Sequence, residues 1–211
     1  MEPDADADAA PAAPPRARPK PGERRMAILQ TLARMLQQPG GERVTTAALA
    51  RELQVSEAAL YRHFASKAQM FEALIDFIEE SVFGMVNWAQ THEAGASAQA
   101  RRVVLGVLQF AEKNPGLARV MSGDALVGEH ERLQARVNHL HDKLEGALRQ
   151  CLRDGADDSP DAAHASLDIR VRASALTAFV IGRVQRQVKT GFARPPGEWA
   201  EDVLARMLPP R

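Results

Sequence analysis

Three helix-start signals follow one another closely between residues 45 and 67, and this spacing restricts the fold more than any other feature. Thr45 or Thr46 can cap a short helix, and Ser56 can cap the next one after a brief turn. Ser66 then begins a longer helix. The two short helices share an apolar seam made of Leu49, Ala50, Leu53, Val55 and Leu60. The segment therefore predicts a helix-turn-helix.

Apolar residues recur at helical spacing along the rest of the chain, and Pro-Gly pairs interrupt them. No strand-like alternation is found. Outside the helix-turn-helix, the expected helices span about 22–38, 67–90, 98–113, 116–122, 124–153, 160–189 and 197–208. Ser159 and Pro160 are the expected start of the second-to-last helix. The pattern predicts an all-α fold of about nine helices.

The charge of the chain is zero overall but unevenly distributed. Residues 1–15 hold four acidic and no basic side chains, whereas residues 16–67 hold ten Lys or Arg against four Glu. A local basic excess is typical of a nucleic-acid-binding surface. We expect a disordered tail at 1–21, a DNA-binding domain at 22–67 and a larger helical domain at 68–211 for dimerisation and partner binding. The basic end of the tail is an arm along the DNA backbone or a solubilising leader.

The second short helix has the chemistry of a recognition helix. Small or polar residues at its start can approach base edges in the major groove: Ser56, Glu57, Ala58, Ala59 and Tyr61. Hydroxyl groups and cations flank it on both sides and suit phosphates: Thr45, Thr46, His63 and Lys67. We expect these nine residues to form the contacts with double-stranded DNA.

The segment Tyr61-Arg62-His63-Phe64-Ala65-Ser66-Lys67 resembles the DNA-binding domain of TetR-family regulators. In that family the tyrosine, the histidine and the lysine lie against the DNA backbone, which implies the same role for Tyr61, His63 and Lys67. The sequence departs from the family at Gln54, where glycine is common in the turn. A left-handed conformation there would be strained for glutamine.

Further matches resemble one branch of that family, the SlmA nucleoid occlusion factors. They include Asn114-Pro115-Gly116-Leu117, Arg132-Leu133-Gln134 and Leu148-Arg149-Gln150. The resemblance implies a cytoplasmic, nucleoid-associated homodimer that binds palindromic sites, engages the division protein FtsZ through its C-terminal tail and antagonises Z-ring assembly. It also implies FtsZ contacts at Phe77 and Lys113, on the fourth and fifth helices, whereas Met85 and Gly106 depart from the expected pattern.

Two other functions fit parts of the same pattern. A ligand-responsive TetR-type repressor would need a specific pocket in the larger domain, but that domain has no tyrosine, and its alanine-rich composition favours a filled interior. A purely architectural DNA-binding protein would not need about two-thirds of the chain beyond Lys67. Phe77 also lies in an apolar stripe, so ordinary core packing is an equal interpretation of it.

Other features point away from catalysis, cofactors and membranes. We find no nucleophile–base pair, P-loop or glycine fingerprint, and therefore expect neither enzyme activity nor a cofactor. His139 and His141 do not share a helix face, so no metal site is expected. The single cysteine, Cys151, suits a buried position in a reducing compartment. No apolar run approaches the ~20 residues of a membrane span, and no signal peptide is recognised.

The dimer is expected to form through the last two long helices. Residues 161–189 carry an apolar row, with small residues that allow close approach: Leu176, Val180, Val184 and Val188, with Ala173 and Gly182. Two such helices from each protomer would form a four-helix bundle.

Overall fold

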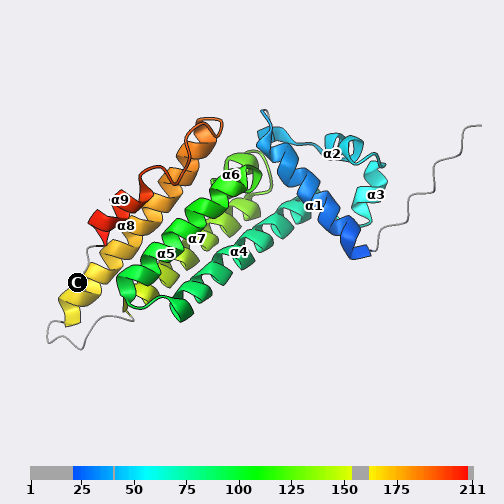
Figure 1. Ribbon diagram of the computed structural model, residues 1–211. Coiled ribbons are helices and arrows are strands. Elements are labelled where there is room, and N and C mark those ends of the chain that lie inside the picture. Colours follow the sequence, from blue (N-terminus) through cyan, green and yellow to red (C-terminus); the bar gives the residue numbers. More distant parts are fainter. Residues whose placement is uncertain (1–20, 40, 154–161, 209–211) are drawn as a thin grey trace, which may run out of the picture.

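The computed structural model describes residues 21–39, 41–153 and 162–208, and every regular element in this part of the chain is helical. Four long helices run alongside one another, and the first three helices gather at the amino-terminal end of α4 (Figure 1). The long helices are α4 (Lys67–His92), α5 (Ala96–Lys113), α7 (Glu131–Arg153) and α8 (Ala162–Lys189). The predicted all-α fold is confirmed. The tail expected at 1–21 lies outside the described residues, apart from its last residue, where α1 begins.

The amino-terminal group of helices, called the head below, comprises α1 (Pro21–Gln37), the short turn η1 (Gly41–Arg43), α2 (Thr46–Glu52) and α3 (Glu57–Tyr61). Side-chain caps begin both short helices, as the sequence predicts. Thr45 Oγ1 accepts a hydrogen bond from the amide of Ala48 at 3.1 Å, and Ser56 Oγ accepts one from the amide of Ala59 at 3.3 Å. Each cap satisfies an amide that the first helical turn leaves without a partner.

The turn between α2 and α3 adopts a conformation that is unusual for its sequence. Gln54 has a φ of +55°, in the left-handed region that favours glycine. The following amide, of Val55, donates to the carbonyl of Ala50 at 3.0 Å and closes the turn. The left-handed conformation that would strain a glutamine is therefore present at Gln54.

The helix α6 (Pro115–Met121) joins the head to the remainder of the molecule, called the body. It lies against α1 so closely that a Cβ on Gly116 would come within 1.9 Å of the carbonyl oxygen of Ala33. Only glycine allows this approach of two helices. Leu32 and Leu36 on the same helix α1 are fully buried, so the head and the body share one continuous core.

Two expected helix boundaries in the body are wrong. The helix expected over 124–153 starts later, because α7 begins at Glu131 after the short turn η2 (Asp124–Leu126). Val127 is extended and Gly128 has a φ of +81°, which interrupts the helix. The last helix, α9 (Ala200–Met207), begins later than the expected 197 because Trp199 is left-handed, with a φ of +58°. The predicted start at Ser159 and Pro160 lies outside the described residues.

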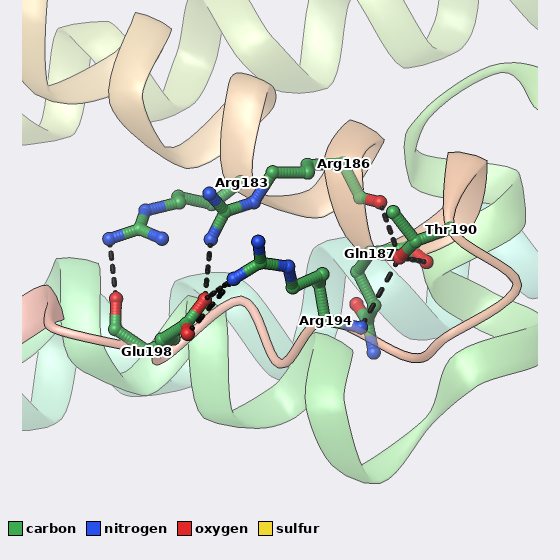
Figure 2. Close-up of polar contacts among 6 residues, drawn as sticks. All are labelled: Arg183, Arg186, Gln187, Thr190, Arg194 and Glu198. Carbon is green, nitrogen blue, oxygen red and sulfur yellow. Dashed lines mark hydrogen bonds and ion pairs between the residues drawn. The ribbon is translucent and has the colours of Figure 1, made fainter.

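A shared carboxylate holds the segment between α8 and α9 against α8. Glu198 accepts from Arg186 at 3.0 Å and from Arg194 at 3.2 Å, while its backbone carbonyl accepts from Arg183 (Figure 2). Burial and the nearby charge of Arg186 lower the pKa of Arg183. The network fixes the return of the chain along α8 and thereby places α9 beside α5.

The outward face of α8 is not the one that the sequence predicted. Four residues of the expected dimer row, and Ala173 beside them, are buried within the protomer: Leu176, Val180, Val184 and Val188. These residues cannot reach a partner chain, because the row faces α5, α6 and α7. The outward face carries Leu167 and Val171, which are 57% and 58% exposed, followed by Gly182. The prediction that the buried row forms the dimer interface is therefore wrong. Only Gly182, of the residues named for that interface, lies on the outward face.

Candidate DNA-binding surface and partner groove

The recognition helix presents the expected residues outward. Ser56, Glu57 and Ala58 are exposed, and Tyr61 is 45% exposed. Leu60, on the opposite side, is fully buried and fixes the helix to the head. The arrangement leaves a short helix with small and polar side chains on its free face, which is the shape that can enter a major groove.

The two helices of the motif are tied together by a side-chain pair. Thr46 Oγ1 donates a hydrogen bond to Glu57 Oε2 at 2.7 Å, across the turn between α2 and α3. Both residues are in the set expected to contact DNA. In this structure they hold each other, so the first turn of the recognition helix has a fixed orientation relative to α2.

Arg25 of α1 supports the far end of the recognition helix, a role that the sequence did not indicate. Its guanidinium donates to the carbonyl of His63 at 2.8 Å and lies 4.0 Å from the ring centre of Phe64. The sequence alone assigns no contact to this arginine. The contact spans 38 residues of sequence, so no local pattern could reveal it.

Lys67, the last residue of the expected DNA-binding set, is the first residue of α4. Ser66 caps this helix by accepting from the amide of Gln69 at 3.2 Å, and the Gln69 side chain accepts from the amide of Ala65 at 2.8 Å. The start at Ser66 is thus as predicted, and Ser66 and Gln69 form a capping box whose return bond comes from the amide one residue earlier than usual. The ammonium group of Lys67 forms an ion pair with Glu129 in the body, which the sequence did not predict.

A groove between the head and the body contains both residues expected to bind a partner. Phe77 and Lys113 line this groove, which has a volume of about 700 Å³ and is formed by α1, α4 and the junction of α5 with α6. Phe77 is 45% exposed, and its ring centre lies 6.4 Å from that of Phe110 on α5. The interpretation of Phe77 as a core residue is therefore wrong.

The two departures from the expected partner site lie against each other. A Cβ on Gly106 would come within 3.0 Å of the sulfur atom of Met85. The methionine side chain of α4 thus fills the space that a larger residue on α5 would occupy. The absence of a side chain at Gly106 leaves room for the long side chain of Met85. In this way the two residues keep α4 and α5 in contact beyond the groove.

A small cavity lies between the described helices of the body. It is bounded by α4, α5, α6, α7 and α8 and measures about 10 Å³, which is close to the space of one water molecule. His141 lies in its wall, and burial lowers the pKa of this histidine. Among the described residues, no three potential metal ligands come together, and no helix is long and apolar enough to cross a membrane.

The family of the chain follows from comparison with known proteins. Residues 28–74 match the family described as "Bacterial regulatory proteins, tetR family", and residues 98–207 match a SlmA-like family described as "Tetracyclin repressor-like, C-terminal domain". The structure of the fatty acid degradation regulator FadR from Bacillus halodurans is similar, with a TM-score of 0.66 at 15% identity over 91% of this chain and 97% of that one. The molecule is thus a helix-turn-helix protein with the TetR fold.

Curated relatives narrow this class further. The nucleoid occlusion factor SlmA of Marinomonas sp. is 44% identical over 192 residues, which cover 90% of this chain and 96% of that protein. The SlmA of Shewanella baltica is 46% identical over 173 residues, which cover 82% of this chain and 87% of that protein. The chain belongs to the SlmA family of nucleoid occlusion factors.

Proposed function

We propose that the chain is a nucleoid occlusion factor that binds palindromic chromosomal DNA as a homodimer, engages FtsZ and inhibits Z-ring assembly over the nucleoid. The observation that carries this proposal is the match to SlmA relatives over almost their whole length, in a chain whose recognition helix is free to bind DNA. On this proposal the chain is located at the nucleoid, and the head locates the DNA while the body acts on the partner.

The head supplies two kinds of DNA contact. Ser56, Glu57 and Ala58 would meet base edges, because their side chains are small or polar and exposed at the start of α3. Phosphates would be contacted from both flanks of that helix, by Thr45, Thr46, Tyr61, His63 and Lys67. Ala59, which is half-buried, would contribute only close packing against the major groove of the DNA.

The outward face of α8 supports a two-fold dimer. Leu167 and Val171 expose apolar surface one helical turn apart, and Gly182 further along has nothing within 4 Å of its missing Cβ. A second copy of the same helix would bury this row and could approach closely at the glycine. Two recognition helices in one dimer then require a near-palindromic site.

The groove at Phe77 and Lys113 supports FtsZ binding. It offers an exposed aromatic ring, apolar walls from Met26 and Leu29, and the cation of Lys113 in a lining that also includes carboxylates. These features suit an extended peptide with apolar side chains and a carboxylate, such as a protein C-terminus. By contrast, the cavity of about 10 Å³ between the described helices of the body is too small for an organic effector, so this space gives no support to the ligand-responsive repressor.

Sedimentation of FtsZ polymers tests this proposal. The DNA is the duplex recovered by the protein from a random pool, and the protein is added with and without it. We expect less FtsZ in the pellet only when the protein and its DNA are both present. Unchanged sedimentation, together with release of the DNA by a small molecule, would establish the repressor instead.

A pair of variants ties the effect to the groove. Phe77→Ala should abolish the effect on FtsZ while leaving DNA affinity unchanged. Trp88→Ala is the matched control, because Trp88 lies on the same helix α4 with nearly the same exposure, 44% against 45%, but outside the groove. Equal losses in both variants would contradict a role for the groove.

A further inference from the structure

The ion pair between Lys67 and Glu129 joins the predicted phosphate-binding lysine to the turn that precedes α7. The two side chains are only 26% and 18% exposed, and the ammonium group also lies 5.6 Å from the ring centre of Phe71. Lys67 is the first residue of α4, where the partial positive charge of the helix end disfavours a cation. The position therefore attracts an anion strongly, and in this structure the anion is the carboxylate of Glu129.

A tight turn holds that carboxylate in place. The amide of Glu129 donates to the carbonyl of Leu126 at 3.0 Å. Val127, with φ −65° and ψ 118°, and Gly128, with φ +81°, have the conformation of a type II turn, in which the glycine supplies the left-handed residue. The ring of His130, directly before α7, then accepts from the amide of Arg132 at 3.3 Å. Hydrogen bonds before and after Glu129 thus hold its backbone in place. Its carboxylate can therefore reach Lys67 without the ordering of a mobile segment.

We propose that Glu129 is an intramolecular competitor of DNA phosphate for Lys67. This inference rests on the proposed DNA-binding function and adds a residue that limits affinity. Carboxylate and phosphate oxygens accept hydrogen bonds from the same ammonium group, so a phosphate can bind Lys67 fully only by displacing Glu129. The displaced carboxylate then lies close to the phosphate, and the two like charges repel each other. Each protomer therefore binds DNA more weakly than its lysine alone would allow.

The contact is independent of base sequence, because Lys67 would meet the backbone. The competition consequently lowers the affinity for all duplexes by the same factor, which favours release from DNA without changing the preferred sequence. The same exchange breaks a link between the start of α4, where Lys67 lies, and the turn that precedes α7, where Glu129 lies.

Fluorescence anisotropy with two labelled duplexes tests the competition. One duplex is that recovered from a random pool, and the other has an unrelated sequence. Glu129→Gln should bind both about 3- to 10-fold more tightly than the unchanged protein, as expected for loss of a partly buried ion pair. Glu131→Gln removes an equal charge two residues away, on an exposed side chain, and should change neither affinity by more than about twofold.

The decisive comparison is made in the background of Lys67→Ala. There, Glu129→Gln should bring no gain, because the group for which it competes is absent. An equal gain in both backgrounds would show general charge repulsion, and weaker binding by Glu129→Gln would show that the carboxylate positions the lysine. Either result overturns the inference, as does unchanged binding by Glu129→Gln. If the unchanged protein bound neither duplex, the proposed function would fall as well.

Discussion

The head and the body carry their functional residues in different ways. In the head, the residues expected to contact DNA fall within one short stretch, and local caps such as Thr45 and Ser56 set their geometry. In the body, the groove brings together Phe77 and Lys113 from different helices, and its third wall comes from α1 of the head. A local motif can therefore identify the DNA-binding surface, whereas the partner groove depends on how distant helices meet.

Distant contacts also set the position of the recognition helix. Arg25 of α1 bonds to the end of that helix within the head, and Gly116 allows α6 of the body to lie directly on α1. Through α1, the recognition helix is thus connected to the body. The orientation of the recognition helix is consequently a property of the whole protomer.

The largest effect is expected where the two regions meet. Gly116→Ala places a Cβ within 1.9 Å of the Ala33 carbonyl, so α1 and α6 must separate. We expect the free energy of unfolding, measured in urea, to fall by about 1–3 kcal/mol or more. Gly84→Ala is the control, because Gly84 is exposed on α4 with open space around it, and the same change there should stabilise by about 0.5–1 kcal/mol. Equal stability of the two variants would argue against a close junction.

The next effect concerns DNA binding by the head. Lys67→Ala should weaken binding about tenfold or more, because it removes a charged contact to phosphate. It should also reduce the slope of log affinity against log salt by about one for each protomer. The measurement is a salt series of binding titrations. Lys113→Ala removes a lysine from the groove instead and should leave both quantities unchanged. A salt slope that stays the same in Lys67→Ala would reject the phosphate contact.

A smaller loss is expected at the start of the recognition helix. Ser56→Ala removes the acceptor for the amide of Ala59, which should cost about 1 kcal/mol of stability and lower Tm by about 2–4 °C. Thermal melting followed by circular dichroism measures it. Ser81→Ala, in the interior of α4, should be neutral or slightly stabilising. If both variants melted alike, the cap would contribute nothing.

The smallest expected effect is a gain in stability at the turn between α2 and α3. Gln54→Gly should relieve the left-handed conformation of the turn and stabilise the protein by about 0.5–1 kcal/mol in urea unfolding. Gln109→Gly makes the same substitution on an exposed position of α5 and should destabilise by about 1 kcal/mol. A gain in stability for Gln54→Gly together with a loss for Gln109→Gly would support a turn that keeps glutamine despite its strain. A loss at Gln54 would contradict the strain.

The success of the sequence predictions follows the same division between local and distant contacts. The caps at Thr45, Ser56 and Ser66 were predictable because each is completed within three residues. The start of α7 was missed because the apolar pattern continues through Gly128, where the backbone turns. The outward face of α8 was misjudged because hydrophobic periodicity identifies an apolar row without indicating which neighbour covers it. The ion pair of Lys67 with Glu129 crosses 62 residues and left no local signal.

The central claim is that the head locates chromosomal DNA so that the body can inhibit division there. Mapping the sites that the protein occupies across the chromosome of its own cell tests this claim most directly. The account predicts many dispersed, near-palindromic sites that are sparse near the replication terminus. A few sites confined to promoters would contradict it and would indicate a transcriptional repressor.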